Sequence, residues 1–246
     1  MTSQDLDIIK HRREAHGIGG LQENLRQIVY GGNDGIVTTF AVVAGFAGAG
    51  AEGAAQMGTL AVVLFGFANL FADATAMGLG EFLSSRAEHD VYRATRASEL
   101  ERQKSEPEEE RAEMLAMLHL RGVQGSDAEN LADQLEKHPE LAADFMMTYE
   151  FGMANPDDES PATNALYTFF SFLFFGFMPL IPYLLFDPSA RTFHLSILAS
   201  GVALFGLGVL RWIAIRVGIL RCIGETLMVG GICALIAYFV GWLIGG

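Results

Sequence analysis

The sequence predicts an all-α integral membrane protein with five transmembrane helices and an acidic cytoplasmic helical insert between helices 2 and 3. Two observations support this fold class. Hydrophobic residues make up 51% of the 246 positions and 28 are glycine, a composition typical of membrane helices. The charge, in contrast, is concentrated, because the range 86–160 holds 19 of the 29 acidic residues and only 8 of the 16 bases. About −11 of the net charge of −13 therefore belongs to this one block.

The composition also excludes several classes of protein. An acidic block disfavours nucleic acid, whose phosphates bind cationic side chains, and favours cations as partners. The only cysteines, Cys222 and Cys233, lie about 16 Å apart along one helix and cannot bridge each other. No G-x-x-x-x-G-K-[ST] motif is present to hold ATP, and no Glu-x-x-His pair suggests a di-iron enzyme. A membrane enzyme is the weakest hypothesis.

The segment 1–30 is predicted to be an N-terminal cytoplasmic amphipathic segment. It contains bases but no apolar core of the kind that a signal peptide needs. Leu21, Leu25 and Ile28 recur at helical spacing beside these bases, a pattern typical of a helix lying on an anionic membrane face. A frayed polar tail is the alternative.

The range 31–85 is predicted to hold transmembrane helices 1 and 2, over 31–50 and 57–83. The first is short and rich in small residues, and Gly31 and Gly35 form a GxxxG pattern that would let another helix approach closely. Its one carboxylate, Asp34, is either functional or a helix cap. The second has no stop signal at the membrane surface, so we expect it to continue as far as Glu106 and Pro107.

The range 86–160 is predicted to be a cytoplasmic metal-binding helical domain. After the continuation of helix 2, a second helix begins at Pro107 and ends at Gly122. A third helical segment, 126–153, is split around His138 and Pro139.

The range 161–246 is predicted to hold transmembrane helices 3–5, over 164–186, 192–215 and 223–244. Pro179 and Pro182 should bend or end the first of these. Glu225 either caps the last one or pairs with Arg221 or Arg216. The short segments on the same side of the membrane as the N-terminus carry seven bases, and those on the opposite side carry one. This bias predicts a cytoplasmic N-terminus.

Four polar or soft side chains share one face of the second predicted crossing. They follow at four-residue steps, and we call them the membrane stripe: Asn69, Asp73, Met77 and Glu81. Ionisable groups at membrane depth are costly and indicate function. With Asp34, this oxygen-plus-thioether set suits a borderline divalent metal such as Fe(II), and protons can compete for the same carboxylates. The alternative is that Met77 only contributes to side-chain packing and that Glu81 lies in water at the membrane interface.

The insert carries a second set of possible metal ligands on three helices. Glutamates at helical spacing and methionines on the facing helix form a pocket if those helices pack together. The alternative is a solvated charged face. The predicted ligands are Glu99, Glu110, Glu113, Met146, Met147 and Glu150, with Glu106, Met114, Met117 and Met153 nearby.

Four motifs give the chain a resemblance to the vacuolar iron transporter family, which includes relatives of the yeast vacuolar calcium and manganese transporter. They are NDGIVTTFAVVAG, AMGLGEFLSSRAEHD, DFMMTYEFGM and FGFMPLIPYLL. The resemblance implies a homodimer with the ion pathway at its interface, exchanging Fe(II), and often Mn(II), for protons.

On that resemblance Asp34 is the metal ligand of helix 1 and Met77 the thioether of helix 2. The insert ligands match Glu99, Glu110, Glu113, Met146 or Met147, and Glu150. The chain departs from the pattern at Asn69, where plant-type relatives have Glu. On that resemblance, Asp73 of this chain substitutes for that Glu from the next helical turn. Arg102 and Ala154 stand where further acids are expected.

The predicted function is export of Fe(II) and possibly Mn(II) from the cytoplasm in exchange for protons. The alternative is a membrane-anchored metal sensor or buffer without transport. No resident cofactor is expected beyond a transported Fe2+ or Mn2+ and a divalent metal in the insert. The expected location is a bacterial inner membrane or a vacuolar-type organelle membrane.

Overall fold

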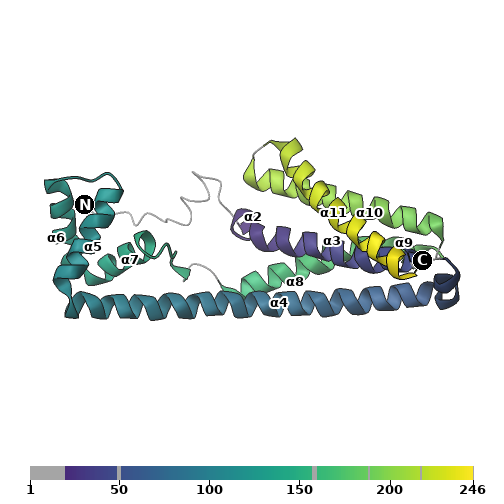
Figure 1. Cartoon of the computed structure of the whole chain (residues 1–246), viewed down its shortest axis with the longest axis horizontal. Coiled ribbons are helices and arrows are strands. Elements are labelled where there is room, and N and C mark those ends of the chain that lie inside the picture. Colours follow the sequence, from purple (N-terminus) through teal and green to yellow (C-terminus); the bar gives the residue numbers. More distant parts are fainter. Residues whose placement is uncertain (1–19, 49–50, 157–159, 188, 217, 246) are drawn as a thin grey trace, which may run out of the picture. The chain divides into compact units, whose positions relative to one another are not determined.

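The computed structural model describes residues 20–48, 51–156, 160–187, 189–216 and 218–245 (Figure 1). All regular secondary structure within these ranges is helical. The predicted basic segment with Lys10, Arg12 and Arg13 lies outside them. The helices are α2 (Gly20–Glu23), α3 (Leu25–Gly48), α4 (Ala51–Ser105), α5 (Pro107–Leu120), α6 (Ser126–Glu136), α7 (Pro139–Tyr149), α8 (Pro161–Phe177), η2 (Met178–Leu180), α9 (Ile181–Leu185), α10 (Ala190–Ile215) and α11 (Ile219–Gly245).

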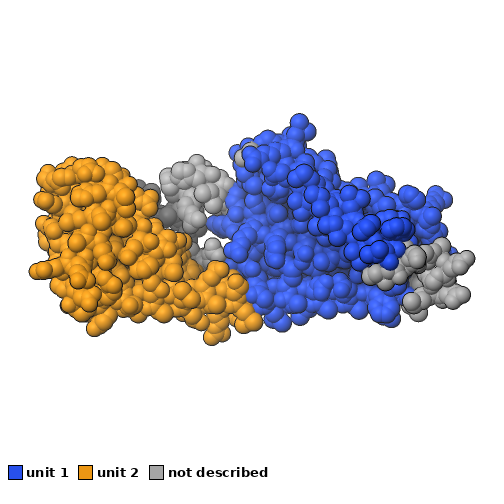
Figure 2. All heavy atoms as spheres, viewed as in Figure 1, with its two compact units in different colours: residues 1–81, 162–246 blue, residues 82–161 orange. Residues whose placement is uncertain are grey.

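Contacts divide the chain into two compact units (Figure 2). Unit 1 comprises Met1–Glu81 and Ala162–Gly246, and unit 2 comprises Phe82–Pro161. Helix α4 belongs to both, since its apolar part lies in unit 1 and its charged part in unit 2. Unit 2 therefore contains the range 86–160 on which the acidic insert was predicted, while the cytoplasmic position and metal binding of that insert stay predictions.

Helix α4 is uninterrupted for 55 residues, as its lack of a stop signal predicted. The charged sequence after Leu83 consists mainly of good helix formers, so the helix continues without a break. It ends at Ser105 because Pro107 occupies the first turn of α5, and the residue before a proline disfavours helical geometry. That residue, Glu106, has the non-helical angles φ −133° and ψ 50°.

Among the described residues, four helices are long and apolar enough to cross a membrane: Ala61–Ser105, Pro161–Leu185, Ala190–Ile215 and Ile219–Leu243. These agree with the second to fifth predicted crossings and indicate a multi-pass membrane protein. Helix α3, the predicted first crossing, is not among them. Asn33, Asp34, Thr38 and Thr39 interrupt its apolar run. The count of five crossings therefore stays a prediction.

Helix α3 is nevertheless packed inside unit 1. It lies beside α10 and α11 (Figure 1). Ile36, Val43 and Ala44 on α3 are almost fully buried, with exposed fractions of 1% or less. A helix with polar residues is kept in place here by neighbours on several sides rather than by its own hydropathy.

Glycines bring the backbones of α3 and α8 into contact. A Cβ atom on Gly31 would lie 2.6 Å from the carbonyl oxygen of Thr168, and one on Gly176 would lie 2.8 Å from the carbonyl oxygen of Gly35. Real side chains do not tolerate such distances, so these positions require glycine. The GxxxG pattern of Gly31 and Gly35 thus marks a helix crossing, as predicted.

The two predicted prolines interrupt the third predicted crossing. Helix α8 ends at Phe177, the 3₁₀ turn η2 contains Pro179, and Pro182 begins α9. In an apolar environment the backbone groups freed by proline need partners within the protein. The Ser196 hydroxyl of α10 donates to the carbonyl oxygen of Pro179 at 2.7 Å and meets that need.

Unit 2 combines a small apolar core with ion pairs. Helices α5, α6 and α7 pack in sequence, and left-handed turns at Gly122 (φ 90°) and Gly125 (φ 60°) connect α5 to α6. Arg96 of α4 binds Glu140 at 2.6 Å and Asp144 at 2.7 Å, which ties α4 to α7. The two apolar clusters of this unit are Met114, Ala142 and Met146, and Leu118, Ala128 and Ala132.

Candidate functional site

Hydrogen bonds orient two carboxylates of the membrane stripe. The Asn69 amide donates from Nδ2 to Oδ2 of Asp73 at 2.7 Å, one helical turn away. Glu81 accepts from Nε2 of Gln27, on α3, at 3.3 Å. Sequence reasoning did not identify Gln27, because its distance of 54 positions from Glu81 gives no local signal. Both donors are neutral amides, so each leaves the negative charge of its carboxylate uncompensated.

Two contacts place α3 antiparallel to the membrane stripe of α4. The rings of Phe46 and Phe65 lie 6.0 Å apart, and Gln27 meets Glu81 towards the other end of the stripe. Between these contacts, Asp34 is close enough to Asp73 for the two carboxylate charges to repel each other. The structure therefore brings the acid of α3 to the level of an acid of α4.

Met77 lies one turn beyond Asp73 and has apolar neighbours. It is half-buried and packs against the cluster that includes Leu70, Ala74 and Phe172. This environment is compatible with the packing role that was the alternative for Met77. Its role as a metal ligand stays a prediction.

Asp34 also lines a hollow of about 830 Å³ inside unit 1. Residues of α2, α3, α10 and α11 form its walls, and charged groups from three of them, Arg26, Arg211 and Glu225, accompany Asp34. Thr38 donates to the backbone carbonyl of Asp34 at 2.8 Å, so this bond does not occupy the carboxylate. Charged side chains of α3, α10 and α11 thus share this hollow with Asp34, whereas Met77 packs against apolar neighbours.

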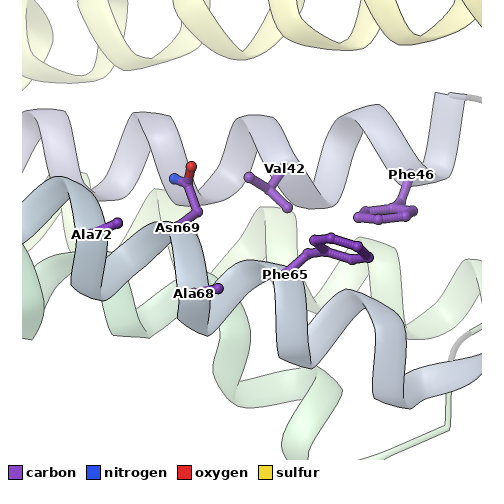
Figure 3. Close-up of a pocket in the computed structure, with 6 residues that line it drawn as sticks. All are labelled: Val42, Phe46, Phe65, Ala68, Asn69 and Ala72. Carbon is purple, nitrogen blue, oxygen red and sulfur yellow. The ribbon is translucent and has the colours of Figure 1, made fainter.

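A second hollow, of about 570 Å³, lies between α3 and α4 (Figure 3). The side chain of Asn69 points from α4 towards α3, beside Val42 (Figure 3). Asn69 is the polar member of an otherwise apolar lining, which is Val42, Phe46, Phe65, Ala68, Asn69 and Ala72. The amide of the membrane stripe therefore faces a largely apolar space.

Glu225 is part of an ion-pair network at the start of α11. It pairs with Arg221 at 2.9 Å, one of its two predicted partners, and its other partner is Arg211 at 3.2 Å rather than Arg216. Arg211 also donates to Thr226 at 3.0 Å. Arg216 instead ends α10 in the left-handed conformation, with φ 56°. The network holds α10 to α11, and it gives Glu225 a structural role.

In unit 2 the structure gathers glutamates from α4, from α5 and from the end of α7. We call them the glutamate cluster: Glu99, Glu106, Glu110, Glu113 and Glu150. Glu99 and Glu110 are buried, with exposed fractions of 3% and 1%. One oxygen of each, Oε1 of Glu99 and Oε2 of Glu110, is buried without a hydrogen-bond partner. Buried carboxylate oxygens without partners are costly, and a bound cation would satisfy them.

Burial and crowding change the protonation of this cluster. Desolvation, followed by the nearby Glu110 carboxylate, raises the pKa of Glu99 to about 8. Desolvation, with smaller contributions from Glu113 and Glu110, also raises the pKa of Glu150. At neutral pH Glu99 therefore holds a proton that a metal ion would have to release.

A guanidinium group lies within the glutamate cluster. Nε of Arg102 is 2.6 Å from Oε1 of Glu110, and its Nη2 is 3.4 Å from Oε1 of Glu113 and 3.8 Å from Oε2 of Glu106. Within the described ranges, no three His, Cys, Asp or Glu side chains form a group that could hold a metal ion as it stands. Sequence reasoning noted Arg102 only as a departure from an acidic pattern. Its spacing of four from Glu106 was the available signal.

The two predicted methionines of the insert differ in their surroundings. Met146 is fully buried in an apolar cluster with Met114 and Ala142, so it contributes to the core of unit 2. Met147 is equally buried and lies outside both apolar clusters of the unit. The role of either methionine as a thioether ligand stays a prediction.

Comparison with known proteins agrees with the sequence motifs. The family model described as the VIT family matches residues 25–242. Vacuolar iron transporter 1 of Arabidopsis thaliana is 31% identical over 235 residues, which cover 94% of this chain and 89% of that relative. The vacuolar iron transporter of Toxoplasma gondii is 32% identical over 229 residues, covering 89% and 74%. Vacuolar iron transporter 1 of Eucalyptus grandis is 31% identical over 205 residues, covering 82% and 78%. The chain belongs to the VIT family.

Proposed function

We propose that this protein is a secondary transporter that moves Fe2+, and also Mn2+, out of the cytoplasm in exchange for protons. The relatives named vacuolar iron transporters support metal transport as its activity. The observation that carries the proposal is that Asp34 on α3 lies near enough to Asp73 on α4 for their charges to repel, and that Asp34 lines an open hollow. Two acids that form no ion pair within the described residues can bind a divalent ion or protons in turn.

The chain's own residues have distinct parts in this exchange. Asp34 and Asp73 would bind the ion and take up protons when it leaves, while Asn69 orients the Asp73 carboxylate. Met77 and Glu81 would extend the path along α4. We further propose five crossings, a cytoplasmic N-terminus and a homodimer, in a vacuolar-type organelle membrane or a bacterial inner membrane.

Reconstituted flux tests this function. Purified protein in liposomes should carry Fe2+ under reducing conditions, and Mn2+, at a rate that rises with an imposed pH gradient. Asp34→Asn should lower this rate by about 100-fold, because the ligand keeps its shape but loses its charge. Met77→Leu should lower the rate less.

A matched variant controls for the loss of a carboxylate. Asp127→Asn changes an exposed carboxylate of α6, so it should leave flux unchanged. Wild-type flux that persists in the double variant of Asp34 and Met77 would rule out this pathway.

A membrane-anchored metal sensor or buffer is the second candidate function. It is favoured by the buried, unpartnered oxygens of Glu99 and Glu110, with Met147 buried in the same unit. These residues suit a divalent metal of borderline softness, since they combine carboxylate oxygens with a thioether. Mn2+ binding without any Mn2+ or Fe2+ flux from the same preparation would favour the buffer over the transporter.

A further inference from the structure

Arg102 differs from Arg96 and Arg111, two other paired arginines of unit 2, in the burial of its partner. Side-chain exposure is only 2% for Glu110, which Arg102 contacts at 2.6 Å. The acidic partners of Arg96 and Arg111, in contrast, are 48–74% exposed. Ion pairs of exposed carboxylates contribute little, whereas a buried carboxylate needs a compensating positive charge. Of Arg96, Arg102 and Arg111, Arg102 is therefore the one that compensates a buried carboxylate.

The Arg102 side chain covers only one part of the glutamate cluster. It binds Oε1 of Glu110, while Oε2 of the same carboxylate and Oε1 of Glu99 are buried without partners. A cation that used these free oxygens would share the Glu110 carboxylate with the guanidinium. Two positive groups at one carboxylate repel each other, so the arginine and a divalent ion compete.

The guanidinium has room to leave. The Arg102 side chain is 43% exposed, and Glu113 and Glu106, its two weaker partners, are 39% and 50% exposed. A long side chain at the surface can turn into water without disturbing the helices that carry the cluster. The carboxylates then remain in place for another cation.

We infer that Arg102 is a built-in counter-ion of the glutamate cluster, which a divalent metal ion must displace from Glu110 in order to bind there. This inference rests on the proposed metal-binding function and concerns its regulation. Without metal, Arg102 stabilises the cluster and keeps Glu110 paired. The site therefore binds metal more weakly than it would without Arg102, and it fills only at metal concentrations high enough to displace the arginine from Glu110.

The inference predicts two effects of opposite sign for Arg102→Gln. Without metal the variant should be less stable in unit 2, because three glutamates lose their shared cation. With metal it should bind Mn2+ about tenfold more tightly or better, since the competing charge is gone. Arg102→Lys keeps the charge but cannot form the same planar contacts, so its affinity should lie between wild type and Arg102→Gln.

The matched control is Arg111→Gln, which removes the same charge from the same unit. Arg111 pairs at 2.6 Å with Asp133 and lies 4.0 Å from Glu136, both half-exposed. This variant should lose a little stability without any gain in Mn2+ affinity.

The experiment uses the full chain in detergent. Mn2+ binding is measured by titration calorimetry, and the stability of residues 82–161 without metal by hydrogen exchange. Glu110→Gln identifies the part of the Mn2+ signal that belongs to the cluster. The inference is supported if Arg102→Gln exchanges faster than wild type without metal and binds Mn2+ more tightly than Arg111→Gln.

Equal or weaker Mn2+ binding by Arg102→Gln, with wild-type binding and flux intact, would overturn the inference and leave the proposed function standing. Unchanged exchange without metal would overturn it as well. If neither wild type nor any variant binds or carries Mn2+ or Fe2+, the proposed function fails together with it.

Discussion

The carboxylates of the membrane stripe in unit 1 and those of the glutamate cluster in unit 2 are compensated in different ways. In unit 1, Asp73 and Glu81 receive hydrogen bonds from the neutral amides of Asn69 and Gln27. In unit 2, Glu110 receives a guanidinium from Arg102. A neutral donor fixes the position of a carboxylate and leaves its charge available, whereas a cation fixes the position and cancels the charge.

The forces that hold the two units together differ as well. Unit 1 depends on close backbone contact at glycines, where a Cβ has no space. Unit 2 has two small apolar clusters and relies more on ion pairs between its helices. We therefore expect unit 1 to respond to side-chain volume, and unit 2 to respond to pH and salt. Three experiments test this difference.

The largest effect is expected from Gly35→Val in unit 1. The new Cβ would overlap the backbone carbonyl of Phe172, which cannot move aside as a side chain could. Overpacking of this kind costs about 1–3 kcal/mol, and the backbone contact places it at the upper end. Thermal unfolding followed by tryptophan fluorescence reports on this unit, because Trp212 and Trp242 both lie in it.

The control for this variant is Gly206→Val, where a Cβ meets nothing within 4 Å. It introduces the same β-branched residue into a helix, so both variants change helix propensity equally. The difference between their melting temperatures then reports the close backbone contact. If both variants lower the melting temperature equally, close backbone contact is not what holds unit 1.

A smaller effect, on the order of 2 kcal/mol, is expected from pH in unit 2. The folded-state pKa of Glu99, about 8, lies above its value in the unfolded chain. The folded form therefore holds a proton that the unfolded form releases, so this stability is fully present below about pH 4.5 and is lost as pH rises through 8. The pKa of Glu150 is also raised in the folded state, so its contribution to stability likewise falls as pH rises.

Hydrogen exchange of residues 82–161, measured without divalent metal between pH 5 and 8 and corrected for intrinsic exchange rates, tests this sign. Protection should fall as pH rises in wild type. It should change much less in Glu99→Gln, because the glutamine side chain does not ionise in this pH range. Protection that increases with pH in wild type would contradict the assigned state of Glu99.

The smallest effect, about 1 kcal/mol, is expected from Arg96→Gln. This variant removes the ion pairs with Glu140 and Asp144 that join α4 to α7. Their carboxylates are well exposed, so salt should screen the pairs, and the difference between variant and wild type should shrink at 1 M salt. Exchange rates of α7 at low and high salt provide the measurement. A difference that salt leaves unchanged would mean that Arg96 acts through packing.

The sequence by itself determined the helical elements of this protein. Composition and helix formers predicted the long α4, Pro107 and Gly122 predicted the bounds of α5, and Pro139, Pro179 and Pro182 predicted the later breaks. These are local effects of backbone geometry, and they act over a few residues. The motifs likewise pointed to the family that the comparisons show.

Only the tertiary structure decided which partners the charged residues have. Each of three pairs, Gln27 with Glu81, Arg211 with Glu225, and Arg102 with Glu110, joins residues of two different helices, so the periodicity of a single helix does not predict them. It also assigned Met146 to an apolar cluster, although Met147 beside it has the same side chain. Electrostatic compensation depends on distance in space and on burial, and both arise only when helices pack.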